Sequence, residues 1–440
     1  MTGMGRSGGL ADLARPLAGD LLRLATGRRG PGTGPLSIED VRALARKRSC
    51  ALPFSYVDSA AEDFTTHRAN LRAFDEVTLR PNLLTDVRER DRGIRLFGRT
   101  LDSPVLLSPT GMPGIQHPDA EFAGAGAAHA AGTVFTVSMA SSHSVTEIAA
   151  RCPGPLWFQL YPWGNPDDFT PYVELARRAG CEALVVTLDT PVGGNREADV
   201  RTGFTMPPRI TRANAGEVLR HPVRFGRWVK TLASGPGIRM GNIAETGVTG
   251  GMNAVHQATK FESKFVPGFS AAELALVRSL WTGPLLVKGI TTGEQARTAH
   301  AAGVDGVIVS NHGGRQLDGL PAALRALPEV AAALHGTGVE ILLDGGIRRG
   351  TDILKALALG ARAVMIGRPW VWGLAAAGRP GVDTVLRILH TELERDMALM
   401  GIRTLDELGP HSLNVPAAWA TRPAGMAAAD PEPASSTLAP

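Results

Sequence analysis

The feature that most constrains the fold is a regular alternation of short hydrophobic runs with segments of helical periodicity. The runs are rich in aliphatic and β-branched residues without polar alternation, which is typical of parallel strands buried on both faces. Parallel strands need helical crossovers, and eight such units in one domain indicate an α/β fold, the (β/α)₈ TIM barrel. The predicted strands are residues 105–108, 134–138, 156–161, 183–189, 285–289, 306–311, 340–345 and 363–367.

Each predicted strand is followed by a segment with the apolar spacing of a helix. An open, doubly wound sheet is the alternative architecture. We disfavour it because no strand is followed by a G-x-G-x-x-G turn that opens a helix. The predicted helices are residues 120–131, 145–151, 166–180, 271–281, 293–303, 324–334, 351–360 and 382–400.

Three parts of the chain depart from this rhythm and divide it into regions around a barrel domain at 36–420. Residues 1–35 are rich in Gly, Arg and Pro and are expected to form a flexible tail, with a surface-anchoring helix at 10–24 as the alternative. Residues 421–440 are rich in Ala, Pro and Ser and are expected to be disordered. Residues 191–269, after the fourth strand, are too long for an ordinary connection, so we expect a long loop that acts as a lid or a docking surface.

Composition narrows the class of protein. The formal net charge is +4, and no dense basic run carries interleaved aromatics, so nucleic acid is not an expected partner. The three cysteines, Cys50, Cys152 and Cys181, form no C-x-x-C pair, which argues against a metal site and favours the reducing cytoplasm. No apolar run approaches the roughly 18 residues that a membrane-spanning helix needs.

Polar side chains or glycines stand at the end of every predicted strand. In a (β/α)₈ barrel these ends meet at one face, where enzymes of this fold place their active sites. Polar groups in such a mouth cost free energy unless a ligand satisfies them, so we predict a binding site there. Besides the glycine-rich ends, the polar residues at this face are Ser138, Gln159, Tyr161, Thr187, Asp189, Lys288, His312 and Asp344.

The last two strands are followed by the sequences DGGIRRG and GRP. Their glycines allow a ligand to approach the backbone, and Arg348 and Arg368 supply positive charge, which together indicate a phosphate site. Tight turns alone would explain the glycines but not both arginines. Lys288 adds a further cation near the barrel axis, for which a buried structural ion pair is the alternative interpretation.

His312 and Asp189 form the predicted acid–base pair. A base that removes a proton from substrate should titrate near neutral pH, and a nearby carboxylate fixes the imidazole tautomer. Strands four and six are near neighbours in the barrel, so the two side chains can meet. Arg196 and Arg315 could hold one carboxylate between two guanidinium groups.

Several motifs resemble those of the FMN-dependent 2-hydroxy acid oxidase and dehydrogenase family, which includes glycolate oxidase, lactate oxidase and dehydrogenase, mandelate dehydrogenase and flavocytochrome b2. The motifs are SNHGGRQLDG, DGGIRRGTD, FQLY and TLDTP-x₄-RE, and SYVDSAAEDFTTHRAN resembles the family's first helical region. The likeness runs from about residue 37 to about residue 408. Alanine at position 60, where the family usually has glycine, is a departure that we expect to be harmless.

The resemblance implies FMN as the cofactor and no metal. The first strand end would lie along the flavin through its backbone, and side chains at the next three would hydrogen-bond its polar edge. Lys288 would stabilise negative charge near N1 and O2 of the reduced flavin. Asp344 would bind the ribityl chain, and the last two strand ends would bind the phosphate. The implied cofactor-binding residues are Pro109, Thr110, Gly111, Ser138, Gln159, Thr187, Lys288, Asp344, Gly345, Gly346, Arg348, Gly367 and Arg368.

The resemblance also implies how a substrate would be held. Tyr56, Arg196 and Arg315 would bind the carboxylate of an (S)-2-hydroxy acid, and Tyr161 would contact its hydroxyl group. His312 would take a proton while two electrons leave C2 for the flavin, which yields a 2-keto acid. Whether that proton leaves carbon or oxygen stays open. The implied catalytic residues are Tyr161, Asp189, Lys288 and His312.

Two departures from the glycolate oxidases bear on specificity. Ala140 and Gly193 stand where those enzymes carry bulky pocket residues, so we expect a substrate larger than glycolate, such as lactate, mandelate or a longer chain. The insertion at 191–269 is similar to that of the lactate and mandelate dehydrogenases. The resemblance therefore implies peripheral membrane contact, and it leaves the electron acceptor open between dioxygen and a quinone or other carrier. It also implies a homo-oligomer, with a tetramer the common form.

Two other functions are compatible with parts of the pattern. A flavoenzyme of this fold could oxidise a different substrate, such as a modified peptide, but relatives of that kind can lose the carboxylate-binding arginine. A non-catalytic phosphate-binding barrel would have no use for His312 together with Lys288. The presence of Arg196 and Arg315 favours the hydroxy acid.

Overall fold

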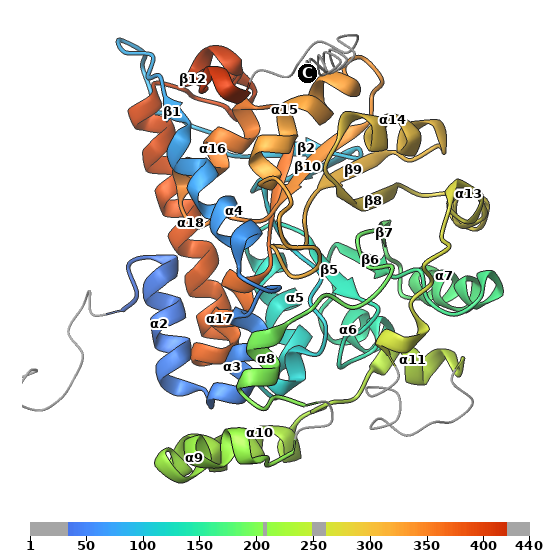
Figure 1. The fold of residues 1–440 in the computed structure, drawn as a ribbon. Helices are drawn as coiled ribbons and strands as arrows, with labels where there is room; N and C mark the ends of the chain where they lie inside the picture. The colour runs from blue at the N-terminus through green and yellow to red at the C-terminus, as the bar shows by residue number, and fades with distance from the viewer. Residues whose placement is uncertain (1–33, 206–208, 249–260, 420–440) are drawn as a thin grey trace, which may run out of the picture. The chain divides into compact units, whose positions relative to one another are not determined.

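The eight predicted strands form a closed parallel barrel in the computed structural model, which describes residues 34–205, 209–248 and 261–419. The strands follow one another around the barrel in chain order (Figure 1). The last strand pairs with the first through Val364 and Val105. The TIM-barrel prediction is confirmed, and the open-sheet alternative is wrong. The strands are β4 (Val105–Leu107), β5 (Phe135–Ser138), β6 (Leu156–Leu160), β7 (Ala183–Thr187), β8 (Leu285–Ile290), β9 (Gly306–Val309), β10 (Glu340–Asp344) and β11 (Ala363–Ile366).

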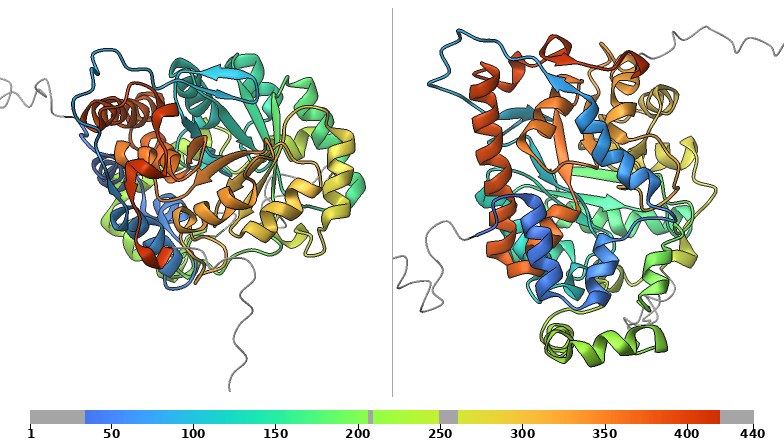
Figure 2. Two further views of the ribbon diagram at one scale, coloured as in Figure 1. Left: turned by 90° about the horizontal axis from the view of Figure 1, so that it is seen from above. Right: turned by 60° about the vertical axis from the view of Figure 1, so that its left-hand side comes forward.

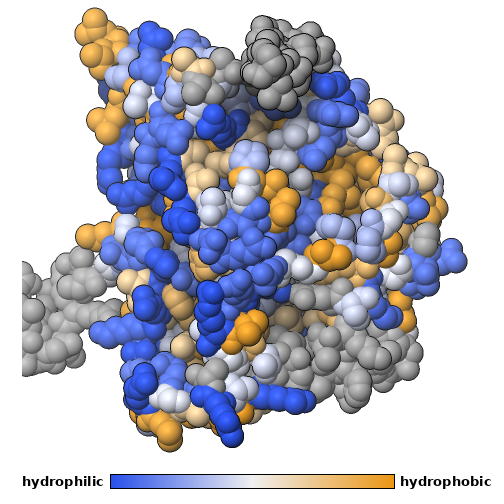
Figure 3. Space-filling model, in the orientation of Figure 1, coloured by the Kyte–Doolittle hydropathy of each residue, from blue (hydrophilic) through white to orange (hydrophobic). Residues whose placement is uncertain are grey.

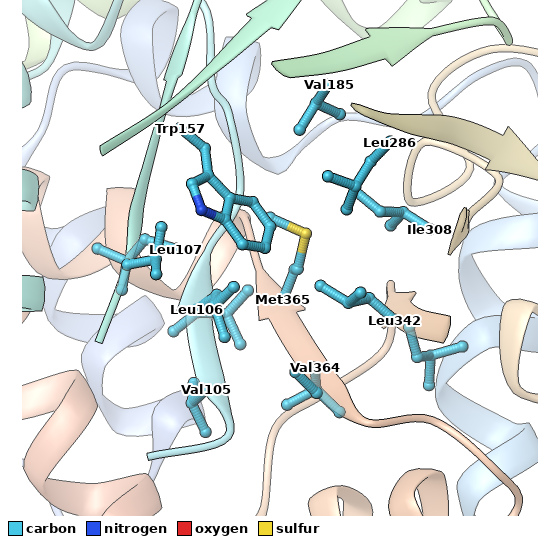
Figure 4. Close-up of a cluster of buried hydrophobic side chains, with 14 of the residues drawn as sticks. Val105, Leu106, Leu107, Trp157, Val185, Leu286, Ile308, Leu342, Val364 and Met365 are labelled. Carbon is cyan, nitrogen blue, oxygen red and sulfur yellow. The ribbon is translucent and has the colours of Figure 1, made fainter. Parts of the chain in front are cut away.

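Large hydrophobic side chains fill the barrel. Figure 4 shows Trp157 and Met365 among aliphatic side chains from neighbouring strands, including Leu286 and Leu342, and all four are buried. Each fully buried side chain of this size contributes about 1.5–3 kcal/mol through the hydrophobic effect. The barrel is therefore a packed core, which leaves its rim for chemistry.

The eight predicted helices are present, with ends shifted by a few residues. Capping boxes start several of them, as where Ser144 and Glu147 bond reciprocally to backbone N–H groups at the start of α6. The segment at 166–180 begins as a 3₁₀ turn before the helix proper. These helices are α5 (Ala120–Ala130), α6 (Val145–Arg151), α7 (Phe169–Arg178), α13 (Ala271–Leu280), α14 (Gly293–Ala301), α15 (Ala323–Ala333), α16 (Gly350–Ala358) and α18 (Arg379–Met400).

Several elements lie outside the predicted alternation. α17 (Arg368–Ala377) comes between the last strand and the closing helix and packs on α18 and α2. Its sequence is apolar on all sides, so it lacks the periodicity of a surface helix. Before the barrel come α2 (Ile38–Arg48), α3 (Ala51–Asp58) and α4 (Thr65–Glu76). The short strands are β1 (Thr78–Leu79) with β12 (Leu413–Asn414) and β2 (Ile94–Leu96) with β3 (Arg99–Leu101), and the 3₁₀ turns are η1 (Pro113–Ile115), η2 (Pro166–Asp168), η3 (Glu262–Lys264), η4 (Leu405–Glu407), η5 (Pro410–Ser412) and η6 (Ala417–Trp419).

The insertion after β7 is largely helical where it is described, and not the long loop that the sequence predicted. It contains α8 (Glu197–Arg201), α9 (Arg212–Arg220), α10 (Pro222–Ser234) and α11 (Gly241–Thr246). Figures 1 and 2 show α9 and α10 at one end of the described structure, away from the β1–β12 pair. The indole N–H of Trp228 donates to the carbonyl of Ile115 at 3.0 Å and so ties α10 to the barrel.

The predictions for the two terminal tails stay predictions. The tails at 1–35 and 421–440 lie outside the described residues, apart from 34 and 35. Among the helices that the structure describes, none is both long and apolar enough to cross a bilayer.

Candidate active site

A cavity of about 580 Å³ opens at the carboxyl ends of the barrel strands. It brings together most of the residues that the sequence singled out. Ser138, Gln159, Thr187 and Asp189 are not among its lining residues, although Asp189 contacts one that is. The predicted site residues that line the cavity are Tyr56, Pro109, Thr110, Gly111, Tyr161, Arg196, Lys288, His312, Arg315, Asp344, Gly345, Gly346, Arg348, Gly367 and Arg368.

His312 and Asp189 meet as predicted. The imidazole Nδ1 lies 2.8 Å from Oδ1 of Asp189. A sharp turn after β9 places the ring, since His312 itself has φ of 55° and its backbone N–H donates to Ser310 Oγ at 3.1 Å. Gly314 follows at φ of 75°, where a Cβ would come within 2.6 Å of the backbone nitrogen of His67. Only glycine fits there, which explains the Gly-Gly pair after the histidine.

The electrostatics of the pair favour a neutral imidazole beside an ionised carboxylate. Burial lowers the pKa of His312, and the charge of Asp189 opposes this without reversing it. Burial alone would raise the pKa of Asp189, but its interactions with His312 and with the charge of Lys288 outweigh burial, and that pKa is lowered. With Nδ1 bonded to Asp189, the other ring nitrogen is left to accept a proton.

Two arginines place positive charge on the same side of the cavity. Arg315 donates to the carbonyl oxygen of Ser59 at 3.0 Å and lies over the ring of Tyr56, 5.5 Å from its centroid. Arg196 approaches Asp199 at 3.6 Å. Burial, and then the charge of Arg196, lower the pKa of Arg315. No carboxylate in the described part of the chain lies within ion-pair distance of Arg315, so a carboxylate ligand would complete its charge balance.

Arg348 and Arg368 add two further cations at the cavity, and Arg368 shares the Ser59 carbonyl oxygen with Arg315. The guanidinium of Arg368 donates to the carbonyl oxygens of Val57, Gly313 and Ser59 at 3.2, 2.9 and 2.8 Å. Arg348 donates to the carbonyl of Ile347 at 2.8 Å. Burial lowers the pKa of Arg348 to about 10 and that of Arg368 to about 9. Within the described ranges neither side chain pairs with a carboxylate, an arrangement that suits a bound anion.

Lys288 forms the buried ion pair that was the alternative interpretation. Its ammonium group lies 3.0 Å from Asp344 Oδ2 and donates to Ser310 Oγ at 3.0 Å. Ser108 donates to the other oxygen of Asp344 at 3.0 Å. Burial would lower the pKa of Lys288, but Asp344 and then Asp189 outweigh it and raise that pKa. Lys288 also lines the cavity, so it is both an ion-pair partner and an available cation.

Gln159 Nε2 and Thr187 Oγ1 are among the buried polar atoms that have no partner in the described structure. Ser138 donates to the other end of the same amide, Gln159 Oε1, at 2.9 Å. An unsatisfied buried group costs about 1–3 kcal/mol, so these atoms call for a ligand with polar atoms at its edge. At Gly346, a Cβ would lie 2.4 Å from the carbonyl oxygen of Asn70, so no side chain fits and only glycine is tolerated.

Comparison with known proteins shows which family the chain belongs to. Residues 45–415 match the model of the family described as FMN-dependent dehydrogenase. The chain belongs to the FMN-dependent dehydrogenase family. It is therefore an oxidoreductase of the 2-hydroxy acid oxidase and dehydrogenase class, and its cofactor is FMN.

Individual relatives of this family member support that assignment. It is 38% identical to glycolate oxidase 1 of Zea mays over 84% of this chain and 94% of the relative. It is 37% identical to a putative L-lactate dehydrogenase of Mycobacterium tuberculosis over 91% of this chain and 94% of the relative. The crystal structure of the monotopic membrane protein (S)-mandelate dehydrogenase superposes with a TM-score of 0.81 at 35% identity and covers 87% of this chain and 100% of that one.

The residues present fit FMN. The unsatisfied atoms of Gln159 and Thr187 suit the polar edge of a flavin, and Lys288 is a cation at the cavity wall. Arg348 and Arg368, near the bare backbone of Gly346, suit a phosphate group.

Sequence reasoning missed an aromatic wall. Phe204, Phe261 and Phe265, all from the insertion, line the cavity. The ring centroid of Phe265 lies 5.4 Å from that of Tyr161, and the ring centroid of Phe204 lies 5.3 Å from that of Tyr56. Nothing in their spacing signalled this, because the sequence predicted no strand in the insertion whose end could place these rings.

A second missed feature is a buried amide pair behind the histidine turn. The side chains of Asn70 and Asn311 donate to each other at 2.8 and 2.9 Å, which links α4 to the residue before His312. Both asparagines stand in quoted motifs, but they are 241 residues apart, so nothing in the sequence indicated that they meet.

The two expected small wall positions have different outcomes. Ala140 lines the cavity as expected. Gly193 is exposed and does not line the cavity, so that part of the expectation is wrong. The neighbouring Gly194 lines the cavity instead.

Proposed function

We propose that this enzyme oxidises an (S)-2-hydroxy acid larger than glycolate to the 2-keto acid, with His312 as the base. The observation that carries the proposal is the pairing of His312 with Asp189 in the same cavity as Arg315, a cation without a described carboxylate partner. A base and a carboxylate clamp are the two groups that this reaction requires of the protein.

The substrate would bind through its carboxylate to Arg315 and Arg196, with Tyr56 beside them. Tyr161 would contact the hydroxyl group as a neutral donor, because burial raises the pKa of its phenol. His312 would then accept the proton at the ring nitrogen that does not face Asp189. The negative charge of Asp189 stabilises the imidazolium that forms. Bound FMN supplies the two-electron acceptor.

The cofactor side of the cavity would hold FMN. The backbone of Pro109, Thr110 and Gly111 would lie along the flavin, and Lys288 would offset negative charge on it. The remaining residues in this role are Ser138, Gln159 and Thr187 at the polar edge, Asp344 at the ribityl chain, and Gly345, Gly346, Arg348, Gly367 and Arg368 at the phosphate.

A substrate with an apolar or aromatic side chain fits the wall of the cavity. Ala140 leaves room, and Phe204, Phe261 and Phe265 present rings to that room. Aromatic pairs contribute about 0.5–1.5 kcal/mol beyond the area they bury. A mandelate-like acid would use this wall, whereas glycolate has no side chain to place there.

The exposed face of α9 and α10 supports peripheral membrane contact. Leu219 and Val223 are 80% and 73% exposed, and Arg220 and Arg227 are exposed on the same two helices. Figure 3 shows hydrophobic and strongly hydrophilic side chains intermixed over this region. Apolar groups with interspersed cations suit an anionic bilayer surface. A carrier such as a quinone then becomes an accessible acceptor beside dioxygen, and a homo-oligomer, such as a tetramer, remains part of the proposal.

The proposal is tested by product analysis of the FMN-loaded protein. Turnover with glycolate, (S)-lactate and (S)-mandelate would be followed with dioxygen or a soluble quinone as the oxidant, and the 2-keto acid would be identified by chromatography. We expect benzoylformate from (S)-mandelate and a lower kcat/KM for glycolate, and no product from (R)-mandelate. Absence of keto acid from every 2-hydroxy acid would overturn the proposal and revive the modified-peptide alternative.

A further inference from the structure

A second cavity, of about 390 Å³, lies apart from the barrel mouth. It is bordered by α10, the residues just after the η1 turn, the junction of α2 with α3, and the last turn of α17. None of the residues proposed for FMN or substrate lines it. It therefore needs its own explanation.

The cavity wall carries an excess of positive charge. Arg48, Arg224 and Arg227 all line it. The guanidinium of Arg48 donates to the carbonyl of Ala376, and that of Arg227 to the carbonyl of Arg48 at 3.3 Å. Across the ranges that the structure describes, none of the three lies within ion-pair distance of a carboxylate, whereas the nearby Arg239 pairs with Glu147 at 3.0 Å. Three arginines without a described carboxylate partner around one space favour an anionic ligand.

A buried amide gives an independent sign of a ligand. Gln116 lines the same cavity, is only 9% exposed, and its Oε1 has no hydrogen-bond partner among the described atoms. Its Nε2 donates to the carbonyl of Pro53 at 2.6 Å, which fixes the orientation of the amide. The free Oε1 can only accept, so the missing partner is a donor such as a hydroxyl group.

The remaining walls suit a small organic anion. α3 begins at the cavity with Cys50 as N-cap, which makes no capping hydrogen bond, so the positive end of that helix faces no capping oxygen. The ring of Trp228 is buried beside Cys50 and Leu52 and supplies apolar surface to the cavity wall.

We propose that this cavity binds a phosphate ester that carries a free hydroxyl group. Arg48, Arg224 and Arg227 would bind the phosphate, and the hydroxyl group would donate to Gln116 Oε1. The ligand could be a free metabolite or the glycerol-containing headgroup of an anionic lipid, since both present this chemistry and α10 carries exposed apolar residues on its outer face.

The test measures binding of sn-glycerol 3-phosphate to the FMN-loaded full chain by calorimetry, and in parallel co-sedimentation with vesicles of phosphatidylglycerol or phosphatidylcholine. The matched variants are Arg224→Ala and Lys230→Ala. Both remove one positive charge from α10, but Lys230 is exposed and does not line the cavity. We expect Arg224→Ala to weaken binding about tenfold, the typical value of a charge-assisted hydrogen bond, and Lys230→Ala to leave it unchanged.

The two arms separate the two sources. One-site binding of soluble glycerol 3-phosphate identifies a free phosphate ester. Vesicle binding that needs phosphatidylglycerol and Arg224, without soluble binding, identifies a lipid headgroup. Gln116→Met should abolish any preference for glycerol 3-phosphate over inorganic phosphate in the first case, and for phosphatidylglycerol over phosphatidate in the second. Binding in neither arm, or equal weakening by Arg224→Ala and Lys230→Ala, overturns the proposal.

Discussion

The two sides of the barrel mouth are built in different ways. At the ends of β10 and β11 the wall is made of short turns, in which bare glycine backbone and the side chains of Arg348 and Arg368 surround the space. At the ends of β7 and β9 the wall combines the His312–Asp189 pair with aromatic residues from the insertion. Short turns constrain a cofactor that every family member shares. A long insertion can vary with the substrate without disturbing that cofactor.

This division predicts that changes on one side spare the other. The largest effect should come from His312→Ala. Loss of the base should slow anaerobic flavin reduction by about 10³-fold, within the usual range for general base catalysis. The flavin content, measured by absorbance after gel filtration, should be unchanged. Loss of FMN together with activity would break the comparison, because His312 would then support the cofactor.

Arg315→Ala should lower kcat/KM by about 10²-fold through loss of a charge-assisted contact to the substrate carboxylate. Arg315→Lys should recover only part, because an ammonium cannot make the forked contact. Arg297→Ala, which removes an exposed arginine from α14, is the control and should have no effect. Steady-state kinetics with (S)-mandelate give the answer, and an unchanged KM and kcat in Arg315→Ala would remove the carboxylate clamp from the account.

Arg348→Ala tests the comparison at the part of the cavity proposed to hold the phosphate of FMN. Removal of one phosphate contact should weaken FMN binding about thirtyfold, as measured by fluorescence titration of the apoprotein. With saturating FMN, the rate of flavin reduction should stay near that of the wild type. A large loss of rate at full FMN occupancy would show that the two sides are not separable.

Phe265→Ala tests the aromatic wall. The ratio of kcat/KM for (S)-mandelate to that for glycolate should fall about tenfold, since removal of apolar contacts costs about 1–3 kcal/mol of discrimination. Phe225→Ala is the matched control, because Phe225 packs against Trp228 on α10 and does not line the cavity. If both variants keep the wild-type ratio, the insertion does not select the substrate.

The smallest effect concerns pH. His312 acts as a base only when neutral, so kcat/KM should rise with pH through the pKa of His312, which burial places below its ordinary value. Asp189 raises that pKa, so Asp189→Asn should move the acid limb to lower pH while reducing the plateau. A pH–rate profile of both proteins shows the shift, and an acid limb that moves to higher pH would contradict the electrostatic role of Asp189.

The same contrast explains what could be predicted from the sequence. The strands were readable because parallel barrel strands are continuous hydrophobic runs, and once they were placed, the strand ends located His312, Asp189 and Lys288 near one another. The glycine and arginine motifs that follow β10 and β11 could be located in the same way. These residues lie within a few positions of an element whose end was predicted.

The parts that could not be predicted depend on distant segments. Phe204, Phe261 and Phe265 lie outside the helices of the insertion, so no periodicity placed them at the cavity. The Asn70–Asn311 pair joins α4 to the turn after β9 across 241 residues. α17 was missed for another reason: it is buried on all sides, so no amphipathic pattern marked it. A buried ion pair of Lys288 was considered only as an alternative, and its partner Asp344 was not identified, because register across the barrel decides which side chains meet.

The most direct test of the central claim is a single-turnover experiment on the wild-type protein. FMN-loaded enzyme is mixed without oxygen with excess (S)-mandelate, and the absorbance of oxidised flavin is followed by stopped flow, with phenylacetate as the control ligand that lacks the hydroxyl group. We predict rapid bleaching with (S)-mandelate and none with phenylacetate. Flavin that stays oxidised with (S)-mandelate, (S)-lactate and glycolate, while FMN remains bound, would contradict the account.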